Sequence, residues 1–166
     1  MKRVTARALA IVGMLAPAAS MAATDDPYAA LKLFDGKWIA VSSAGGATPI
    51  ENHCARTGKF FACEQMVNGK TAALVVFLPD GPTEKGEAYL VQTLVPTGQK
   101  PGLWRTLTIE GDRWTYSDPA PRGGKARRER SVDQFLGPDH IHYELQSSVG
   151  GKAWITVRSG DQRRAP

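Results

Sequence analysis

Several features that define large classes of proteins are missing from this sequence. Beyond its first 23 residues it has no run of 18 apolar residues, which argues against a transmembrane helix. It has no Gly-x-Ser-x-Gly elbow and no glycine loop with the spacing of a phosphate-binding site. Its aromatic residues are not interleaved with basic ones as in single-strand nucleic-acid binders, so we expect no nucleic-acid partner.

The N-terminal segment has the pattern of a secretory signal peptide. A cationic start precedes an apolar stretch over 8–16, and small residues end the segment at 20–23. We expect residues 1–23 to be removed by cleavage after Ala22 or Ala23, and the protein to be periplasmic or secreted. No cysteine follows the segment closely, so we expect no membrane anchor.

The remaining residues, 24–166, have the length of one domain, roughly 143 residues. All three charges of the N-terminal segment are positive, so its removal lowers the net charge from +5 to about +2. Only the stretch 122–130 is densely basic, and we interpret it as a solvated loop or hairpin.

Short apolar runs separated by turn residues dominate the rest of the chain. Asp26-Pro27 is typical of a helix start and predicts a short helix over 27–34. Gly, Pro, Asn and Asp then recur at short intervals, and no helical period is long enough to connect parallel strands. We therefore predict an all-β fold: a single antiparallel meander β-barrel of about eight to ten strands with a short N-terminal helix. The predicted strands cover 37–43, 50–57, 60–66, 70–78, 87–95, 103–110, 113–118, 126–135, 140–148 and 152–159.

Alternation sorts the faces of several strands. Over 140–146 the apolar residues share one face and the histidines the other, and over 152–159 Ile155 and Val157 share the apolar face. The run 74–78 is apolar without alternation, which predicts a strand buried on both sides. The strand at 126–135 has charges on both faces, which favours an edge strand blunted by charge over a strand with polar groups on a cavity wall.

The two cysteines of the mature chain predict a disulfide, because an exported protein meets an oxidising environment. A two-residue turn at Gly58-Lys59 places Cys54 opposite Cys63 in a pair without backbone hydrogen bonds, where side chains lie closest. The spacing lacks the Cys-x-x-Cys pattern of redox-active pairs, so we expect a structural bridge.

The segment Gly36-Lys37-Trp38, directly after the predicted helix, resembles the start of lipocalins and other calycin-like barrels. The resemblance implies a meander barrel in which Gly36 and Trp38 have structural roles and Trp38 closes one end. It also implies that an arginine near the end of the last strand packs across this tryptophan. Arg158, or Arg163 and Arg164, are the candidates for that role.

Candidate ligand-binding residues follow from the predicted barrel. Its interior is either filled or holds one small ligand. Aromatic side chains would supply the walls, and one or two strand arginines turned inward would pair a carboxylate or phosphate. The candidates are Phe77, Trp104, Trp114, Tyr116 and Tyr143, with Arg105, Arg113, Arg128 and Arg130 as the arginines.

A metal site is a further hypothesis. His140, His142 and Glu144 project from one face of a strand and could hold a divalent metal such as zinc, with His53 as another nitrogen ligand. A solvent-facing stripe is the alternative, since the opposite face is already apolar.

The sequence favours an exported lipocalin-like protein that binds a small, partly apolar ligand, and we expect no cofactor. One alternative is an interaction or inhibitor module that binds a protein partner through loops 79–87 and 119–125. Another is a metal-dependent enzyme that uses the His-x-His-x-Glu strand. Catalytic activity is left open, with a binding protein preferred over an enzyme.

Overall fold

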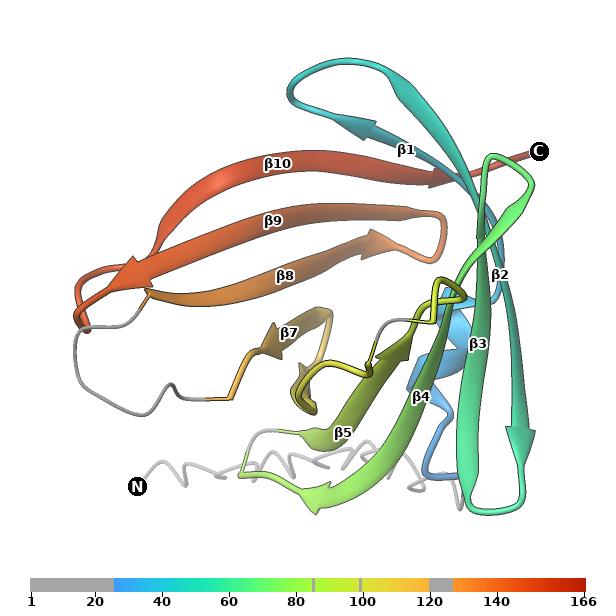
Figure 1. The fold of residues 1–166 in the computed structure, drawn as a ribbon, viewed down its shortest axis with the longest axis horizontal. Coiled ribbons are helices and arrows are strands. Elements are labelled where there is room, and N and C mark those ends of the chain that lie inside the picture. Colours follow the sequence, from blue (N-terminus) through green and yellow to red (C-terminus); the bar gives the residue numbers. More distant parts are fainter. Residues whose placement is uncertain (1–25, 85, 99, 120–126) are drawn as a thin grey trace, which may run out of the picture.

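The computed structural model describes residues 26–84, 86–98, 100–119 and 127–166. The predicted signal peptide, most of loop 119–125 and much of the basic stretch 122–130 lie outside the described residues. Ten antiparallel strands form a closed barrel in which each strand pairs with the next along the chain and the last pairs with the first (Figure 1). The predicted all-β meander barrel is confirmed.

A short 3₁₀ helix, η1 (Ala30–Phe34), stands where the sequence predicted a helix, and the Asp26 carboxylate accepts a hydrogen bond from the Tyr28 N–H. The strands that follow are β1 (Gly36–Ser42), β2 (Ala47–Thr57), β3 (Phe60–Val67), β4 (Lys70–Pro82), β5 (Glu87–Leu94), β6 (Arg105–Glu110), β7 (Arg113–Ser117), β8 (Arg127–Gly137), β9 (His140–Val149) and β10 (Ile155–Arg164).

The sequence located all ten strands but misplaced the last one. β10 begins at Ile155 and continues to Arg164, beyond the predicted end at residue 159. The predicted apolar face is also wrong, because Ile155 and Val157 are 62% and 52% exposed. A bulge between Thr156 and Arg158 interrupts the alternation, and a bulge cannot be seen in a pattern that assumes a period of two.

Two further predictions about strand environment are corrected. Leu74 in β4 is 40% exposed whereas Phe77 is 3% exposed, so this strand is buried on one side only. β8 is no edge strand, because it pairs with both β7 and β9. Because the closed barrel excludes an edge strand, the alternative interpretation of β8 remains, in which its polar groups line the wall of a cavity.

The hairpin geometry follows the turn residues. Asn68 and Gly69 adopt φ values of 53° and 72°, as a two-residue type I′ turn requires. Gly58 adopts φ 61°, and the register pairs Thr57 with Phe60 and Cys54 with Cys63. The predicted disulfide is present, with Cα atoms 4.0 Å apart. It joins β2 to β3 on the inner face of the barrel.

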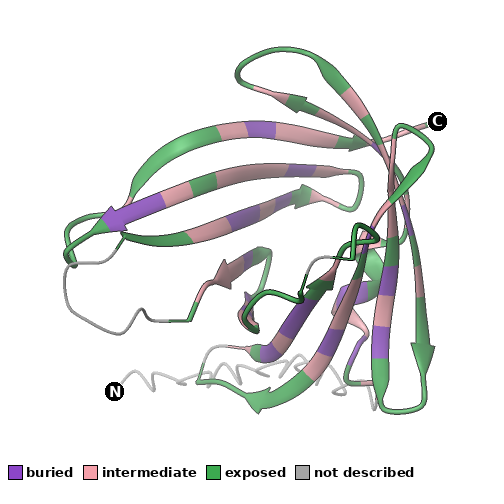
Figure 2. Ribbon diagram, in the orientation of Figure 1, coloured by how far each residue is buried: buried purple, intermediate pink, exposed green. Residues whose placement is uncertain are grey.

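The core lies at one end of the barrel, where η1 closes the interior. Tyr28 and Leu31 are fully buried there, and in Figure 2 the buried residues of β3, β4 and β5 gather near this segment. Trp114 packs between Phe34 and Phe135, with ring centroids 5.0 and 4.6 Å away. η1 therefore acts as a plug, and the opposite end of the barrel has no comparable cluster of buried aromatic rings among the described residues.

Arg164 fastens this plug to the barrel. It lies opposite Trp38 in the β1–β10 ladder, and its guanidinium carbon is 4.4 Å from the centroid of the Trp38 ring. Nη1 and Nη2 donate hydrogen bonds to the carbonyls of Asp35 (2.7 Å) and Leu33 (3.0 Å). Trp38 Nε1 donates to Phe34 O.

Gly36 is required at this junction. It has φ 105°, and a Cβ there would lie 2.9 Å from Arg164 Nη1. The arginine that packs across Trp38 is thus Arg164, one of the candidates, and Arg158 lies elsewhere. Trp38 itself is buried, with 1% of its surface exposed.

We predict that Arg164→Ala destabilises the protein by about 2 kcal/mol, because two helix-end carbonyls and the face of Trp38 lose a charged partner. Arg163→Ala is the matched control, since Arg163 is exposed beside it, and it should change stability by less than about 0.5 kcal/mol. Equilibrium urea unfolding measures both. Equal effects of the two substitutions would contradict the fastening role.

We also predict that the disulfide stabilises the barrel by roughly 2.5–3 kcal/mol, since it closes a loop of about ten residues in the unfolded chain. The Cys54→Ala/Cys63→Ala double variant should lose this amount in urea unfolding relative to the oxidised protein. Reduction of the double variant should have no further effect. If oxidised wild type and the variant unfold at the same urea concentration, the bridge contributes nothing.

Candidate ligand cavity

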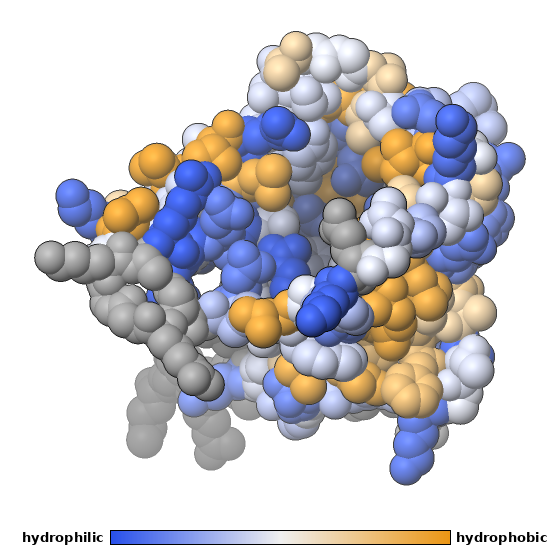
Figure 3. All heavy atoms as spheres, in the orientation of Figure 1, coloured by the Kyte–Doolittle hydropathy of each residue, from blue (hydrophilic) through white to orange (hydrophobic). Residues whose placement is uncertain are grey.

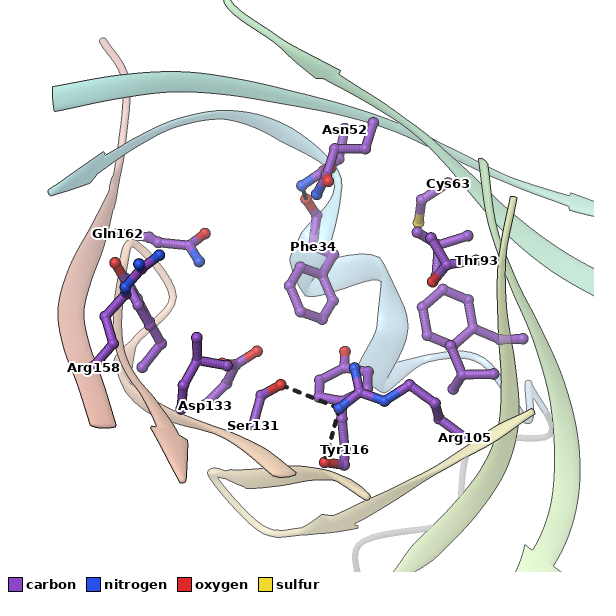
Figure 4. Close-up of a pocket in the computed structure, with 16 residues that line it drawn as sticks. Phe34, Asn52, Cys63, Thr93, Arg105, Tyr116, Ser131, Asp133, Arg158 and Gln162 are labelled. Carbon is purple, nitrogen blue, oxygen red and sulfur yellow. Dashed lines mark hydrogen bonds between the residues drawn. The ribbon is translucent and has the colours of Figure 1, made fainter. Parts of the chain in front are cut away.

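The barrel interior above the plug contains a cavity of about 400 Å³. Figure 4 shows Phe34 of η1 pointing into it from the closed end. Its other lining residues are Asn52, Cys63, Gln65, Val75, Phe77, Val91, Thr93, Arg105, Tyr116, Ser131, Asp133, Tyr143, Leu145, Arg158 and Gln162. On the face drawn in Figure 3, hydrophilic residues surround a recess in the middle of the molecule, with hydrophobic residues on both sides.

The two halves of the wall differ in chemistry. β4 and β5 contribute the apolar side chains of Val75, Phe77 and Val91, whereas β6–β10 contribute most of the hydroxyl, amide and charged groups. Every second residue of a barrel strand faces inward, so the residue types at these inward positions set the chemistry of each half. A molecule in this cavity would contact hydrocarbon on one side and hydrogen-bonding groups on the other.

Asp133 is the charged residue held deepest in the wall. It is only 8% exposed, and among the described residues no donor forms a hydrogen bond with its carboxyl group. Burial raises the pKa of Asp133 from 3.8 to about 7, against the opposing effect of the nearby Arg105 charge. The cavity therefore contains a carboxyl group that lacks the partner a buried polar group normally has.

Arg105 lies on β6, which β7 separates from β8, and it also lines the cavity. Its Nε lies 2.7 Å from Asp118 Oδ1, in an ion pair without hydrogen-bond geometry. Nη2 makes long hydrogen bonds to Tyr116 O (3.4 Å) and Ser131 Oγ (3.5 Å), drawn as dashed lines in Figure 4. Burial raises the pKa of the Tyr116 phenol well above its usual value, with the Asp133 charge adding to the effect. The phenol is thus a hydrogen-bond donor throughout the physiological pH range.

A second, more hydrophilic recess of about 580 Å³ adjoins the cavity and shares Arg105, Ser131, Leu145 and Arg158 with it. Arg158 is exposed at this junction and has no ion pair or hydrogen bond within the described residues. The shared residues form the mouth through which the cavity meets solvent.

Four of the nine candidate ligand-binding residues line the cavity, namely Phe77, Arg105, Tyr116 and Tyr143. The other five lie elsewhere. Trp114 is 1% exposed and belongs to the aromatic core, and Trp104 is 44% exposed on the segment before β6. Arg128 stacks on Trp154, and its guanidinium carbon is 5.5 Å from the centroid of the Trp154 ring.

The other predicted arginines are also accounted for. Arg113 is exposed beside the turn that joins β6 and β7, and Arg130 borders the mouth recess. Arg130 packs 4.2 Å from the Trp154 ring centroid and donates to Gln146 Oε1 at 2.7 Å.

Sequence reasoning missed Asp133, Ser131 and Gln162. The first two share the inner face of β8, and the charge on both faces of this strand was the available signal. Gln162 was missed because it lies beyond the predicted end of β10. Phe34 ends the segment predicted to be a helix, and its ring forms the floor of the cavity.

The residues predicted to bind metal lie on the outer side of the barrel. His140 Nε2 and His142 Nδ1 lie 2.7 and 3.4 Å from the same oxygen of Asp161, whereas Glu144 accepts from Thr156 at 3.3 Å. His53 lies beside Glu51. Within the described ranges no three His, Cys, Asp or Glu side chains are grouped so as to hold a metal ion. The structure thus does not bring Glu144 together with the two histidines, which pair with Asp161.

Similarity between this chain and known proteins is confined to the fold. No protein family matches the sequence, and no curated protein matches it significantly. The fold is similar to the crystal structure of Rv2717c from M. tuberculosis, with a TM-score of 0.46 and 14% sequence identity. The similar region covers 84% of this chain and 98% of that one. The likeness is distant, and the function is therefore inferred from the residues of this chain.

In the described parts of the chain, no helix has the length and hydropathy needed to cross a bilayer.

We predict that Asp133 makes stability depend on pH. Because its pKa is raised in the folded state, it contributes stability that is fully present below about pH 4 and is lost as pH rises through about 7. Asp133→Asn removes this dependence. The stability of wild type relative to the variant should thus fall by up to about 4 kcal/mol between pH 4 and pH 8.

Urea unfolding of both proteins at several pH values measures this difference, in which the titration of other groups cancels. Glu129→Gln removes an exposed carboxylate from the same strand and serves as the control. A constant difference between wild type and Asp133→Asn would show that the carboxyl group is paired or hydrated.

Proposed function

We propose that this protein is an exported, lipocalin-like binding protein that holds a small, partly apolar molecule inside its barrel. The observation that carries the proposal is the cavity of about 400 Å³ with an unpaired, buried carboxyl group in its wall. Ligand pockets usually have volumes of about 300–1,000 Å³ and combine apolar walls with a few polar groups that orient the ligand.

The division of the wall supports this function. Filled barrels bury their inward side chains against one another, but here polar groups of β6–β10 face open space across from Val75, Phe77 and Val91. A bound molecule would cover this apolar surface and supply hydrogen bonds to the polar side. The plug formed by η1, Trp38 and Arg164 supports binding by closing one end, so that a ligand enters through the mouth at Arg158.

Export rests on the sequence. The N-terminal segment has the three parts of a signal peptide, and a disulfide is typical of proteins that fold in an oxidising compartment. We therefore place the binding function in the periplasm or outside the cell.

We predict that the uncharged dye N-phenyl-1-naphthylamine binds the mature protein at one site, with a blue-shifted and enhanced fluorescence. The side chain of Val75 lines the cavity. Val75→Trp should weaken binding at least tenfold, because the larger side chain occupies the volume that the ligand needs. Leu74→Trp is the matched control: its side chain lies on the outer face of the same strand, and binding should be unchanged.

Leu145→Trp provides a second cavity-filling variant nearer the mouth, in case Val75→Trp does not fold as judged by circular dichroism. Absence of saturable dye binding, or equal binding by the two β4 variants, would contradict a ligand site inside the barrel.

A further inference from the structure

Three charged residues line the cavity among the described residues: Arg105, Asp133 and Arg158. Arg105 has an acidic partner in Asp118, and Arg158 is exposed to solvent at the mouth. Asp133 is only 8% exposed, and among the described residues no donor forms a hydrogen bond with its carboxyl group. It is thus the group whose environment a bound molecule changes most.

The chemistry of a carboxyl group decides what this molecule must offer. An ionised carboxyl group only accepts hydrogen bonds, and a protonated one still has an accepting oxygen. A donor on the ligand therefore satisfies Asp133 in either state, whereas an acceptor on the ligand bonds only with the protonated state. A positively charged donor gains most, because charge-assisted hydrogen bonds are about twice as strong as neutral ones.

The groups around Asp133 are compatible with such a donor. Tyr116 of β7 contributes a phenol, and Arg158 and Gln162 of β10 complete this side of the wall (Figure 4). Tyr143 of β9 contributes a second phenol. Arg105 and Arg158 are the charges that oppose a cation here. Asp118 partly offsets Arg105 from 2.7 Å, and Arg158 is exposed to solvent at the mouth. Across the cavity, the apolar side chains of β4 and β5 leave room for a hydrocarbon body.

We propose that the ligand of this cavity is a small organic amine, whose protonated nitrogen donates to the Asp133 carboxylate while its apolar body packs against Phe77 and Val91. This inference rests on the proposed binding function and specifies the class of ligand. Asp133 is accordingly the residue that determines specificity.

Competition against N-phenyl-1-naphthylamine tests the inference with three probes of matched shape: 4-phenylbutylamine, 4-phenylbutyrate and butylbenzene. At pH 8 the amine should displace the dye at a concentration at least tenfold below that of the other two. Its apparent affinity should fall at least tenfold between pH 8 and pH 5.5. Protonation of Asp133 removes the negative charge over this range, while the amine and the Tyr116 phenol stay protonated.

Asp133→Asn should lose both the preference for the amine and its dependence on pH, each measured relative to the variant's own affinity for the dye. Glu129→Gln removes an exposed carboxylate of the same strand that does not line the cavity, and it should keep both. If the dye binds and 4-phenylbutyrate or butylbenzene competes as well as the amine, the amine proposal is wrong and the binding function stands. If the dye does not bind wild type at all, both proposals fail.

Discussion

The contact between Arg164 and the first strand determines how the rest of this protein is arranged. The last described strand ends with a guanidinium that stacks on Trp38 and binds the carbonyls of Leu33 and Asp35. One side chain thus joins β10 to β1, where the barrel closes, and fixes η1 inside that end. Because the plug fills only one end, the packed aromatic core and the open cavity are separated along the barrel, with Phe34 at the boundary between them.

Closure also explains why charged residues on β8 are compatible with a stable barrel. A strand with neighbours on both sides has no free edge to protect, so the residues on its inner face must line either the core or a cavity. Phe135 is in the core, whereas Asp133 and Ser131 face the cavity. A buried carboxyl group without a partner destabilises the folded state when it is ionised. Under the proposed function, a donor on the bound molecule offsets this cost.

Much of the fold was predictable because turn chemistry and alternation are local. Asn68-Gly69 and Gly58-Lys59 set the register of two hairpins, and the second of these turns led directly to the Cys54–Cys63 bridge. The site was only partly predictable because it depends on contacts between distant strands. β10 continues to Arg164, which the ladder with β1 places opposite Trp38, and a bulge between Thr156 and Arg158 interrupts its alternation. Whether Tyr116 or Trp114 faced the cavity depended on how far the plug reaches into the barrel, and no local pattern contains that information.

The central claim is that a small molecule occupies the cavity above the plug. Native mass spectrometry of the mature protein, purified from an exporting host, tests it most directly when wild type and Leu145→Trp are compared. The account predicts that wild type carries an organic adduct that dissociates on collisional activation, and that the cavity-filling variant carries much less of it. A wild-type protein that is bare at every activation energy, or an adduct that Leu145→Trp retains in full, would contradict the claim.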